Sequence, residues 1–310
     1  MNVLVTGGAG FIGSHIVDRL VADGHSVAAV DILATGKRAN VNPQAALYEI
    51  DIRSPALAAA FEATRPEVVF HVAAHASVSE SVRDPMHDAE VNVLGTLNVL
   101  QQCSAYGVGR FVFSSTGGAL YGEPERLPAD EEHPVRPLSP YGASKDAAEA
   151  YVRTLCSLSG IRYTILRYGN VYGSRQDPFG EAGVVAIFAK AMMRGQRPTI
   201  FGDGSHERDY VYVDDVVQAN VLAFGQDADG VYNIGTGEGT TVSQVFDAVA
   251  GATDYGGSAE HAVERPGDVH RIYLDVRRAE RELGWRAVVS LEEGIRRTVD
   301  AMREAEAGEE

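Results

Sequence analysis

Gly7-Gly8-Ala9-Gly10-Phe11-Ile12-Gly13 follows an apolar run at residues 1–5 and opens an amphipathic stretch at residues 11–22. The run predicts a buried strand and the stretch predicts a helix. Glycines in the spacing G-x-x-G-x-x-G between a strand and a helix are typical of a dinucleotide-binding turn. We expect Gly7 to form the tight turn, Gly10 to leave room for a pyrophosphate at the helix start, and Gly13 to allow close helix–strand packing. A glycine-rich turn without a ligand is the alternative.

A second strand is predicted at residues 27–31 and ends in an acid, Asp31. A carboxylate at this position accepts hydrogen bonds from a ribose 2′-hydroxyl and repels a 2′-phosphate, which favours NAD over NADP. A third strand, at residues 46–50, leads into Asp51 and Ile52. We expect these two residues to reach the adenine.

A tyrosine and a lysine stand four residues apart in Tyr141-Gly142-Ala143-Ser144-Lys145. On a helix they share one face. Ser139 and Pro140 predict an N-cap and a first helical position, which places Tyr141 in the first turn, where the helix dipole favours an anion. We expect the Lys145 ammonium, together with the positive nicotinamide ring of NAD, to lower the pKa of the phenol, normally about 10, so that it can act as a base. An exposed Tyr/Lys pair on a surface helix is the alternative.

A predicted strand at residues 110–113 ends in three hydroxyl side chains, Ser114-Ser115-Thr116. A hydroxyl at the carboxyl end of a strand can orient a substrate hydroxyl and share its proton. A glycine loop, an acid, a hydroxyl and a Tyr/Lys pair in this order are hard to obtain by chance. Together they indicate redox chemistry at a hydroxyl-bearing carbon.

Strand-like and helix-like stretches alternate through the first half of the chain, which predicts an α/β fold with a Rossmann-type doubly wound parallel sheet. The regular alternation stops after Tyr172. We therefore predict an NAD-binding Rossmann domain at residues 1–172, on which residues of about 205–235 pack back. Residues 173–310 would form a smaller C-terminal α/β domain that binds the substrate.

The composition excludes several classes of partner. The chain has 310 residues, a formal net charge of −16 and 45% hydrophobic residues. The negative charge argues against nucleic acid and anionic membranes as partners, and no stretch is long and apolar enough to span a bilayer. The first strand starts at the N-terminus, which leaves no room for a signal peptide, so we expect a cytoplasmic protein. No metal-ligand spacing occurs; Cys103 is expected to be a buried thiol, and Asp214 and Asp215 to cap a helix start.

Seven motifs carry a family resemblance. In chain order they are VTGGAGFIGSH (5–15), DILATG (31–36), HVAAH (71–75), SSTGGALYG (114–122), SPYGASK (139–145), LRYGNVYG (166–173) and RDYVYVDD (208–215). With them the chain resembles the extended short-chain dehydrogenase/reductase family, and within it the UDP-glucose (UDP-galactose) 4-epimerases, over essentially its whole length.

The resemblance implies NAD-dependent C4 epimerisation of a UDP-hexose, UDP-glucose or UDP-galactose. Tyr141 would take the proton of the sugar 4-hydroxyl while NAD takes the hydride from C4. The 4-keto intermediate would turn about its diphosphate link and receive the hydride on its other face. Thr116 would bind the 4-oxygen, with Ser115 as the alternative because this strand end is one residue longer than the commoner form. Lys145 would hold the nicotinamide ribose.

The resemblance also implies a set of binding residues. The cofactor contacts would be Gly7, Gly10, Phe11, Ile12, Gly13, Asp31, Ile32, Leu33, Thr35, Gly36, Asp51, Ile52, Ala73, Ala74, His75, Asn92, Ser114, Tyr141, Lys145 and Tyr168. The substrate contacts would be Ser115, Thr116, Tyr141, Asn170, Val185, Thr199, Phe201, Arg208, Arg265 and Asp268. Among them, Arg208 and Arg265 suit the diphosphate, because arginine binds phosphate oxygens in a fork.

Other activities and the assembly stay open. Gly117 and Gly118 stand where the 4,6-dehydratase branch has an Asp-Glu pair, which disfavours that reaction. A UDP-glucuronate 4-epimerase, another NDP-sugar short-chain dehydrogenase and an NAD-binding sensor without catalysis are alternatives. Ile272, near a position that gates the C2 substituent, leaves UDP-N-acetylhexosamines open as substrates. The family implies a homodimer, through helices at residues 88–106 and 146–158.

Overall fold

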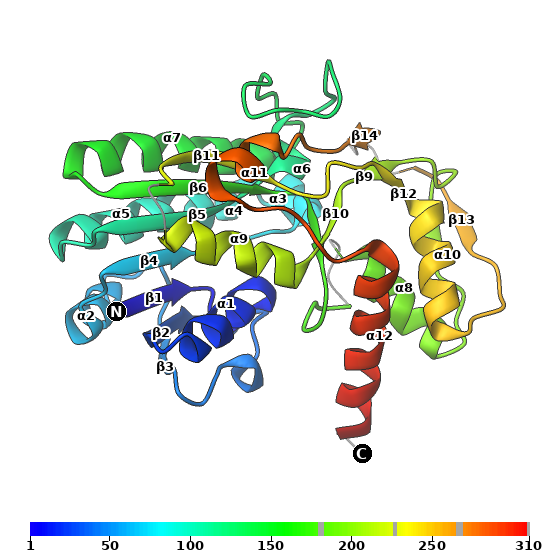
Figure 1. Ribbon diagram of the computed structural model, residues 1–310, viewed down its shortest axis with the longest axis horizontal. Helices are drawn as coiled ribbons and strands as arrows, with labels where there is room; N and C mark the ends of the chain where they lie inside the picture. Colours follow the sequence, from blue (N-terminus) through cyan, green and yellow to red (C-terminus); the bar gives the residue numbers. More distant parts are fainter. Residues whose placement is uncertain (179–182, 226–227, 265–268, 309–310) are drawn as a thin grey trace.

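A parallel sheet of seven strands forms the centre of the molecule in the computed structural model, which describes residues 1–178, 183–225, 228–264 and 269–308 (Figure 1). The strand order is β11-β6-β5-β4-β1-β2-β3. The strands are β1 (Asn2–Thr6), β2 (Ser26–Asp31), β3 (Ala46–Glu49), β4 (Val68–His71), β5 (Arg110–Thr116), β6 (Arg162–Tyr168) and β11 (Gly230–Ile234). The order reverses between β1 and β4, so the predicted doubly wound sheet is confirmed, with its binding crevice expected at the carboxyl ends of these strands.

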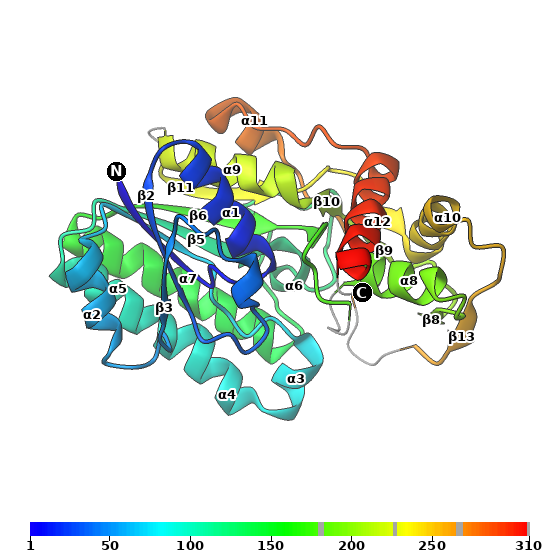
Figure 2. The same cartoon turned by 90° about the horizontal axis from the view of Figure 1, so that it is seen from below.

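Helices cover both faces of the sheet, which explains why the strands are apolar on both sides. One face carries α1 (Phe11–Ala22) and α9 (Val213–Gly225), which pack against each other. The other carries α2 (Leu57–Thr64), α5 (Thr96–Ala105) and α7 (Pro140–Ser159). Figure 2 shows α5 and α7 side by side on their face.

The single helix expected at residues 88–106 is interrupted. It consists of α4 (Pro85–Ala89), a π-helical turn (Glu90–Gly95) and α5. The π turn brings the Gly95 backbone so close to Ile52 that a Cβ at residue 95 would lie 2.6 Å from Ile52 Cδ1. Such turns often occur at functional sites, and this one buries Asn92.

The part of the chain that follows β6, called the second part below, has short strands and its own helices; the first part is the chain up to the end of β6. Helices α8 (Val184–Met193), α10 (Val242–Thr253) and α12 (Leu291–Gly308) lie together, away from the large sheet (Figures 1 and 2). The remaining elements are α3 (Val78–Arg83), α6 (Gly117–Leu120), β7 (Asn170–Tyr172), β8 (Thr199–Phe201), β9 (Glu207–Arg208), β10 (Tyr210–Tyr212), β12 (Thr240–Thr241), β13 (Glu260–Ala262), β14 (Arg271–Ile272) and α11 (Arg277–Leu283). They form sheets in the orders β10-β7, β12-β9-β14 and β13-β8.

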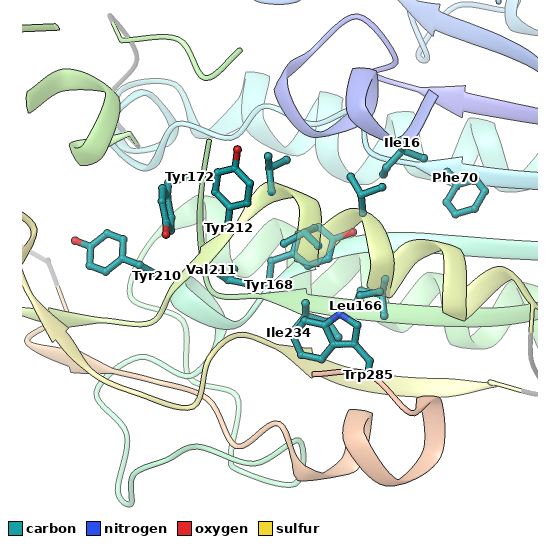
Figure 3. Packing of buried hydrophobic residues seen from close by; sticks show 14 of the residues in the cluster. Ile16, Phe70, Leu166, Tyr168, Tyr172, Tyr210, Val211, Tyr212, Ile234 and Trp285 are labelled. Carbon is teal, nitrogen blue, oxygen red and sulfur yellow. The ribbon is translucent and has the colours of Figure 1, made fainter. Parts of the chain in front are cut away.

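One hydrophobic cluster joins the two parts. It contains Ile16 and Phe70 from the first part and Tyr212 and Trp285 from the second (Figure 3). Helix α9 and strand β11 return to the large sheet, where α9 packs against α1 and β11 pairs with β6 along five residues. The second part is therefore anchored to the sheet through a shared core.

Candidate active site

The glycine loop has the geometry that the motif predicts. Gly7 adopts φ +69° and a Cβ there would lie 2.7 Å from Ala73 N, so this turn requires glycine. A Cβ at Gly13 would lie 2.1 Å from Gly7 O, which confirms the close packing of helix and strand. At Gly10 it would meet only Gly7 O, at 3.2 Å. Gly10 is also the N-cap of α1 and supplies no capping side chain, so the N–H groups of Phe11 and Ile12 remain available to an anion.

Asp31 lies at the end of β2 beside this loop. Its Oδ2 accepts from Ala9 N at 3.0 Å and its Oδ1 from Leu33 N at 2.8 Å. The carboxylate therefore shapes the glycine loop while each oxygen retains acceptor capacity for a ribose hydroxyl. Leu33 adopts φ +57°, an uncommon conformation for a branched residue that marks the loop containing Thr35 and Gly36 as constrained.

The segment after β4 forms the wall opposite the glycine loop. Ala73 N donates to Thr6 O at 3.1 Å, which ties the ends of β1 and β4 together. His71 is buried between Thr6 and Thr96, and burial, helped by Lys145, lowers its pKa to about 3. His71 is thus a neutral core residue. Ala74, next along this wall, is partly exposed.

Asn92 fixes this wall to helix α7. Its Oδ1 accepts from His75 N at 2.8 Å, and its Nδ2 lies 3.0 Å from both His75 O and Ser144 Oγ. The residue is 2% exposed. In the structure the Asn92 amide therefore holds the His75 loop in place, and the predicted contact of Asn92 with the cofactor stays a prediction.

Tyr141 lies in the first turn of α7, as predicted. Ser139 is the N-cap and its hydroxyl accepts from Gly142 N at 3.2 Å, with Pro140 at the first helical position. Tyr141 N donates to Ser81 Oγ at 3.1 Å, so α3 fixes the start of the helix. Tyr141 is partly exposed.

The expected lowering of the Tyr141 pKa, which included the charge of NAD, does not occur in the protein alone. Burial of the phenol, followed by the nearby Asp88 carboxylate, raises the pKa of Tyr141. Lys145 Nζ instead donates to Ser114 O at 2.6 Å and lies 4.3 Å from the centre of the Phe113 ring. Burial lowers the pKa of Lys145 to about 8. The phenolate therefore requires a further positive charge beside it.

The three hydroxyls at the end of β5 have different partners. Ser114 Oγ lies 3.0 Å from the Tyr168 hydroxyl in the core. Ser115 is 4% exposed and its Oγ donates to Glu149 Oε1 at 2.6 Å, so the structure does not support it as the substrate-binding alternative. Thr116 is partly exposed, and its Oγ1 accepts from Ala119 N at 3.2 Å, which leaves its hydrogen free to bind a substrate oxygen.

Gly118, which the sequence set only against the acids of the dehydratase branch, is not among the predicted contacts but lies beside two of them. A Cβ at this position would lie 3.2 Å from Asn170 Oδ1 and 3.9 Å from Thr116 Oγ1. The missing side chain therefore leaves open the space between a predicted catalytic group and a predicted substrate contact. Asn170 and Val185 line one narrow recess together with Gln176, which confirms that β7 meets the start of α8.

The more distant substrate candidates lie on the small sheets. Thr199 and Phe201 are on β8, and Phe201 is exposed. Arg208 is on β9, where its Nη1 donates to Glu207 O at 2.9 Å. The predicted contacts Arg265 and Asp268 lie outside the described residues. Ile272 is buried with Tyr121, Ala129, Val269 and Leu274, and its place near a C2 substituent stays a prediction.

Several residues that were predicted to contact the cofactor have side chains that are bonded or packed within the protein. Asp51 is bonded to Arg53, which holds the pKa of Asp51 below its ordinary value. Ile52 is buried in the core. Tyr168 is buried and hydrogen-bonded to Asn220, so a cofactor contact would have to use its backbone. Ile32 is exposed beyond the end of β2.

The residues present fit NAD. The cradle requires glycine at residues 7 and 13, the start of α1 is open at Gly10, and Asp31 suits a ribose 2′-hydroxyl. In the part of the chain that the structure describes, there is no group of His, Cys, Asp and Glu side chains that could hold a metal ion. None of the helices in the described residues is long and apolar enough to cross a membrane.

Comparisons with known proteins agree with this geometry. Residues 3–235 match the model of the NAD dependent epimerase/dehydratase family. A putative UDP-glucose 4-epimerase of Methanocaldococcus jannaschii is 48% identical over 97% of this chain and 98% of its own length.

Two crystal structures are similar over nearly the whole chain. One is UDP-glucose 4-epimerase of Thermotoga maritima with UDP-glucose, with a TM-score of 0.96 and 50% identity over 98% of this chain and 99% of that one. The other is the Thermus thermophilus UDP-glucose 4-epimerase complex with NAD, with a TM-score of 0.95 and 51% identity over 98% of this chain and 100% of that one. A glycine cradle, a Tyr/Lys helix and a matching family model together lead to one conclusion: the chain belongs to the NAD dependent epimerase/dehydratase family.

Proposed function

We propose that the protein catalyses NAD-dependent C4 epimerisation of a UDP-hexose, UDP-glucose and UDP-galactose. The observation that carries the proposal is the convergence of Thr116, Tyr141 and Lys145 at the end of the sheet that also holds the glycine loop. The proteins similar over the full chain are named UDP-glucose 4-epimerases, which supports the same reaction.

Three side chains of the protein would have separate roles in the reaction. Tyr141 would remove and return the proton of the 4-hydroxyl, and Thr116 would donate to the 4-oxygen from the neighbouring strand end. When bound, NAD supplies the hydride acceptor and a positive charge. Lys145, already held by Ser114 O, would bind the nicotinamide ribose.

The two parts of the chain would divide the ligands. We propose that residues 1–172 hold NAD and that residues 173–310 hold the nucleotide sugar. Asn170, at the junction, faces the space left by Gly118. Val185, Thr199, Phe201 and Arg208, with Arg265 and Asp268, would bind the UDP moiety; arginine suits a diphosphate because its planar fork matches phosphate oxygens.

We also propose a homodimer in the cytoplasm. Helices 88–106 and 146–158 pack against each other and expose Leu94, Tyr151 and Leu158, which are 56%, 42% and 79% accessible. Large apolar side chains on neighbouring helices suit a self-complementary interface. The buried free thiols Cys103 and Cys156 suit a reducing compartment.

Turnover of UDP-galactose by the purified protein, with and without added NAD, tests the proposal. We expect conversion to UDP-glucose without net formation of NADH. UDP-N-acetylgalactosamine and UDP-glucuronate, assayed in parallel, would reveal a 4-epimerase of another sugar. Bound NAD without conversion of any of the three would overturn the proposal and leave another nucleotide-sugar reaction or an NAD sensor.

A further inference from the structure

Glu149 continues the stripe of α7 that carries the catalytic pair. It lies four residues beyond Lys145, as Lys145 lies four beyond Tyr141, so all three side chains share one helix face. Glu149 is completely buried, with an exposed fraction of 0%. A buried carboxylate is tolerated only when it is paired and hydrogen-bonded.

Four hydrogen bonds hold this carboxylate. Arg167 on β6 donates from Nε to Oε1 at 2.9 Å and from Nη2 to Oε2 at 2.7 Å, a bidentate fork. Ser115 Oγ donates to Oε1 at 2.6 Å, and Arg153 Nη1 donates to Oε2 at 3.0 Å. Although burial opposes the charge, Arg167 and these neighbours hold the pKa of Glu149 below its ordinary value. Glu149 is therefore an anion.

Side chains on this helix face form hydrogen bonds with two consecutive residues of β5, Ser114 and Ser115. Lys145 Nζ donates to Ser114 O, and Ser115 Oγ donates to Glu149. The next residue is Thr116, which offers its hydroxyl to the substrate. The two contacts thus set the distance between the helix that bears the phenol and the strand end that bears the hydroxyl.

Glu149 is also the main acid opposing the loss of the Lys145 proton. Burial lowers the pKa of Lys145 to about 8, against the attraction of Glu149 and, more weakly, of Asp88 from α4. The other titratable group with which Lys145 interacts is His71 on β4, which is neutral. Removal of the Glu149 charge would therefore favour the uncharged amine.

We propose that Glu149, held by Arg167, is a positioning residue for the epimerisation: it fixes Thr116 against Tyr141 and places a negative charge one turn from Lys145. The effect on turnover rests on the proposed function. The effect on the charge of Lys145 does not, so the two can fail separately.

The chain offers a direct measurement, because Lys37, Lys145 and Lys190 are its three lysines. Protein labelled with ¹³C-lysine should show three side-chain signals, and the variants Lys37→Arg and Lys190→Arg would assign them. We expect the Lys145 signal to titrate near pH 8 and to move down by about one pH unit in Glu149→Gln, as expected for loss of a neighbouring opposite charge. This readout needs no substrate.

Turnover is measured on the same variants. Glu149→Gln should lower kcat about tenfold to a hundredfold, with the alkaline limb of the pH profile moved down in parallel with the Lys145 signal. Ser115→Ala, which breaks the strand contact but keeps the charge, should lower kcat about fivefold and leave the Lys145 titration unchanged. Arg153→Gln removes one half-exposed partner of the same carboxylate and leaves the Arg167 fork and the Ser115 contact in place, so it should change both quantities less than Glu149→Gln does.

The pair variant Glu149→Gln/Arg167→Met removes both buried charges together, and it serves if the single variant does not fold. It should still lower kcat, since the contact with β5 is weakened. A folded variant, judged by its unfolding midpoint, that keeps both the wild-type Lys145 titration and a kcat within about twofold of wild type would overturn the proposal. If the wild type itself turns over none of the sugars, the epimerase function fails and the lysine titration still decides whether Glu149 governs Lys145.

Discussion

The two parts of the molecule are organised by different kinds of contact. In the first part, neighbouring strands of the large sheet pair along four to seven residues, and their side chains are buried apolar residues. In the second part, the strand pairs extend along only two or three residues. There, two buried acids, Asp209 and Asp215, accept hydrogen bonds from segments that are distant in the sequence and hold these segments together.

Asp209 shows how a single side chain replaces a ladder of strand bonds. It accepts from Thr236 N at 2.6 Å, Thr236 Oγ1 at 2.7 Å, Gly237 N at 3.1 Å and Leu274 N at 3.1 Å. Asp214 and Asp215 lie in the first turn of α9, at the predicted helix start. The Asp215 carboxylate accepts from Val288 N and Val289 N, so it joins α9 to a distant segment. A repeated pattern organises the first part, and individual polar contacts organise the second.

The sharpest test of this division is removal of the Tyr141 hydroxyl. If the first part carries the chemistry and the second carries the sugar, Tyr141→Phe should lower kcat about a thousandfold and leave the Kd of the UDP-sugar within a few-fold of wild type, because the group lost acts on the transferred proton. Steady-state kinetics and calorimetry measure the two effects. Tyr151→Phe, on the exposed side of the same helix, is the control and should behave as wild type. Near-normal turnover of Tyr141→Phe would remove it as the base.

The second prediction concerns a substitution that removes the hydrogen bonds of Asp209 in the second part. Asp209→Ala removes the acceptor of four donors at once, and we expect a loss of about 4 kcal/mol in the free energy of unfolding, since unpaired buried donors are costly. Asp209→Asn keeps one acceptor oxygen and should lose less. Urea unfolding gives both values. The exposed Asp203 is the control, because Asp203→Ala should leave the midpoint unchanged; equal behaviour of Asp209→Ala and Asp203→Ala would contradict the comparison.

The third prediction concerns the buried charge at the catalytic end of the first part. The pKa of Lys145 is lowered by burial from 10.5 to about 8, so the folded protein binds fewer protons than the unfolded chain between these two pH values. Its free energy of unfolding should therefore rise with pH in that window, relative to Lys145→Met, by about 3 kcal/mol, since one pKa unit corresponds to about 1.4 kcal/mol. Denaturant titrations at pH 7.5 and 10.5 measure the difference. A difference independent of pH would show that folding does not lower the pKa of Lys145.

The smallest effect is expected at Arg208, the proposed diphosphate contact of the second part. Arg208→Ala should raise KM for the UDP-sugar about thirtyfold with little change in kcat, because a charged hydrogen bond is lost equally from the ground and transition states. Arg271→Ala, a neighbouring half-exposed arginine bonded to Glu207, is the control. An unchanged KM for Arg208→Ala would mean that other groups hold the diphosphate.

Much of the first part could be predicted because its signals are local. Helix α1 begins and ends at the predicted residues, and the turn, the N-cap Ser139 and the position of Tyr141 followed from neighbours within a few residues. The helix predicted at 88–106 contains a π turn that the sequence did not predict, and Gly95 of this turn packs against Ile52, which lies far away in the sequence.

The missed site residues have long-range causes. Asp88 is an ordinary acid on a helix in the sequence, yet in the fold it is 1% exposed beside Asn92 and raises the pKa of Tyr141. Gly118 is one of 33 glycines, and its importance follows from Asn170, which lies on another strand. No spacing rule connects these residues.

The sequence by itself determined the parallel sheet, the cofactor turn and the Tyr141/Lys145 pair, because periodicity and short spacings set the conformation of adjacent residues. Only the tertiary structure decided that Lys145 binds the carbonyl of Ser114, that Glu149 is paired with Arg167, and that Asp209 holds the second part together. Those contacts join residues 18 to 31 positions apart, and folding alone brings them within hydrogen-bond distance and removes the water that would otherwise separate their charges.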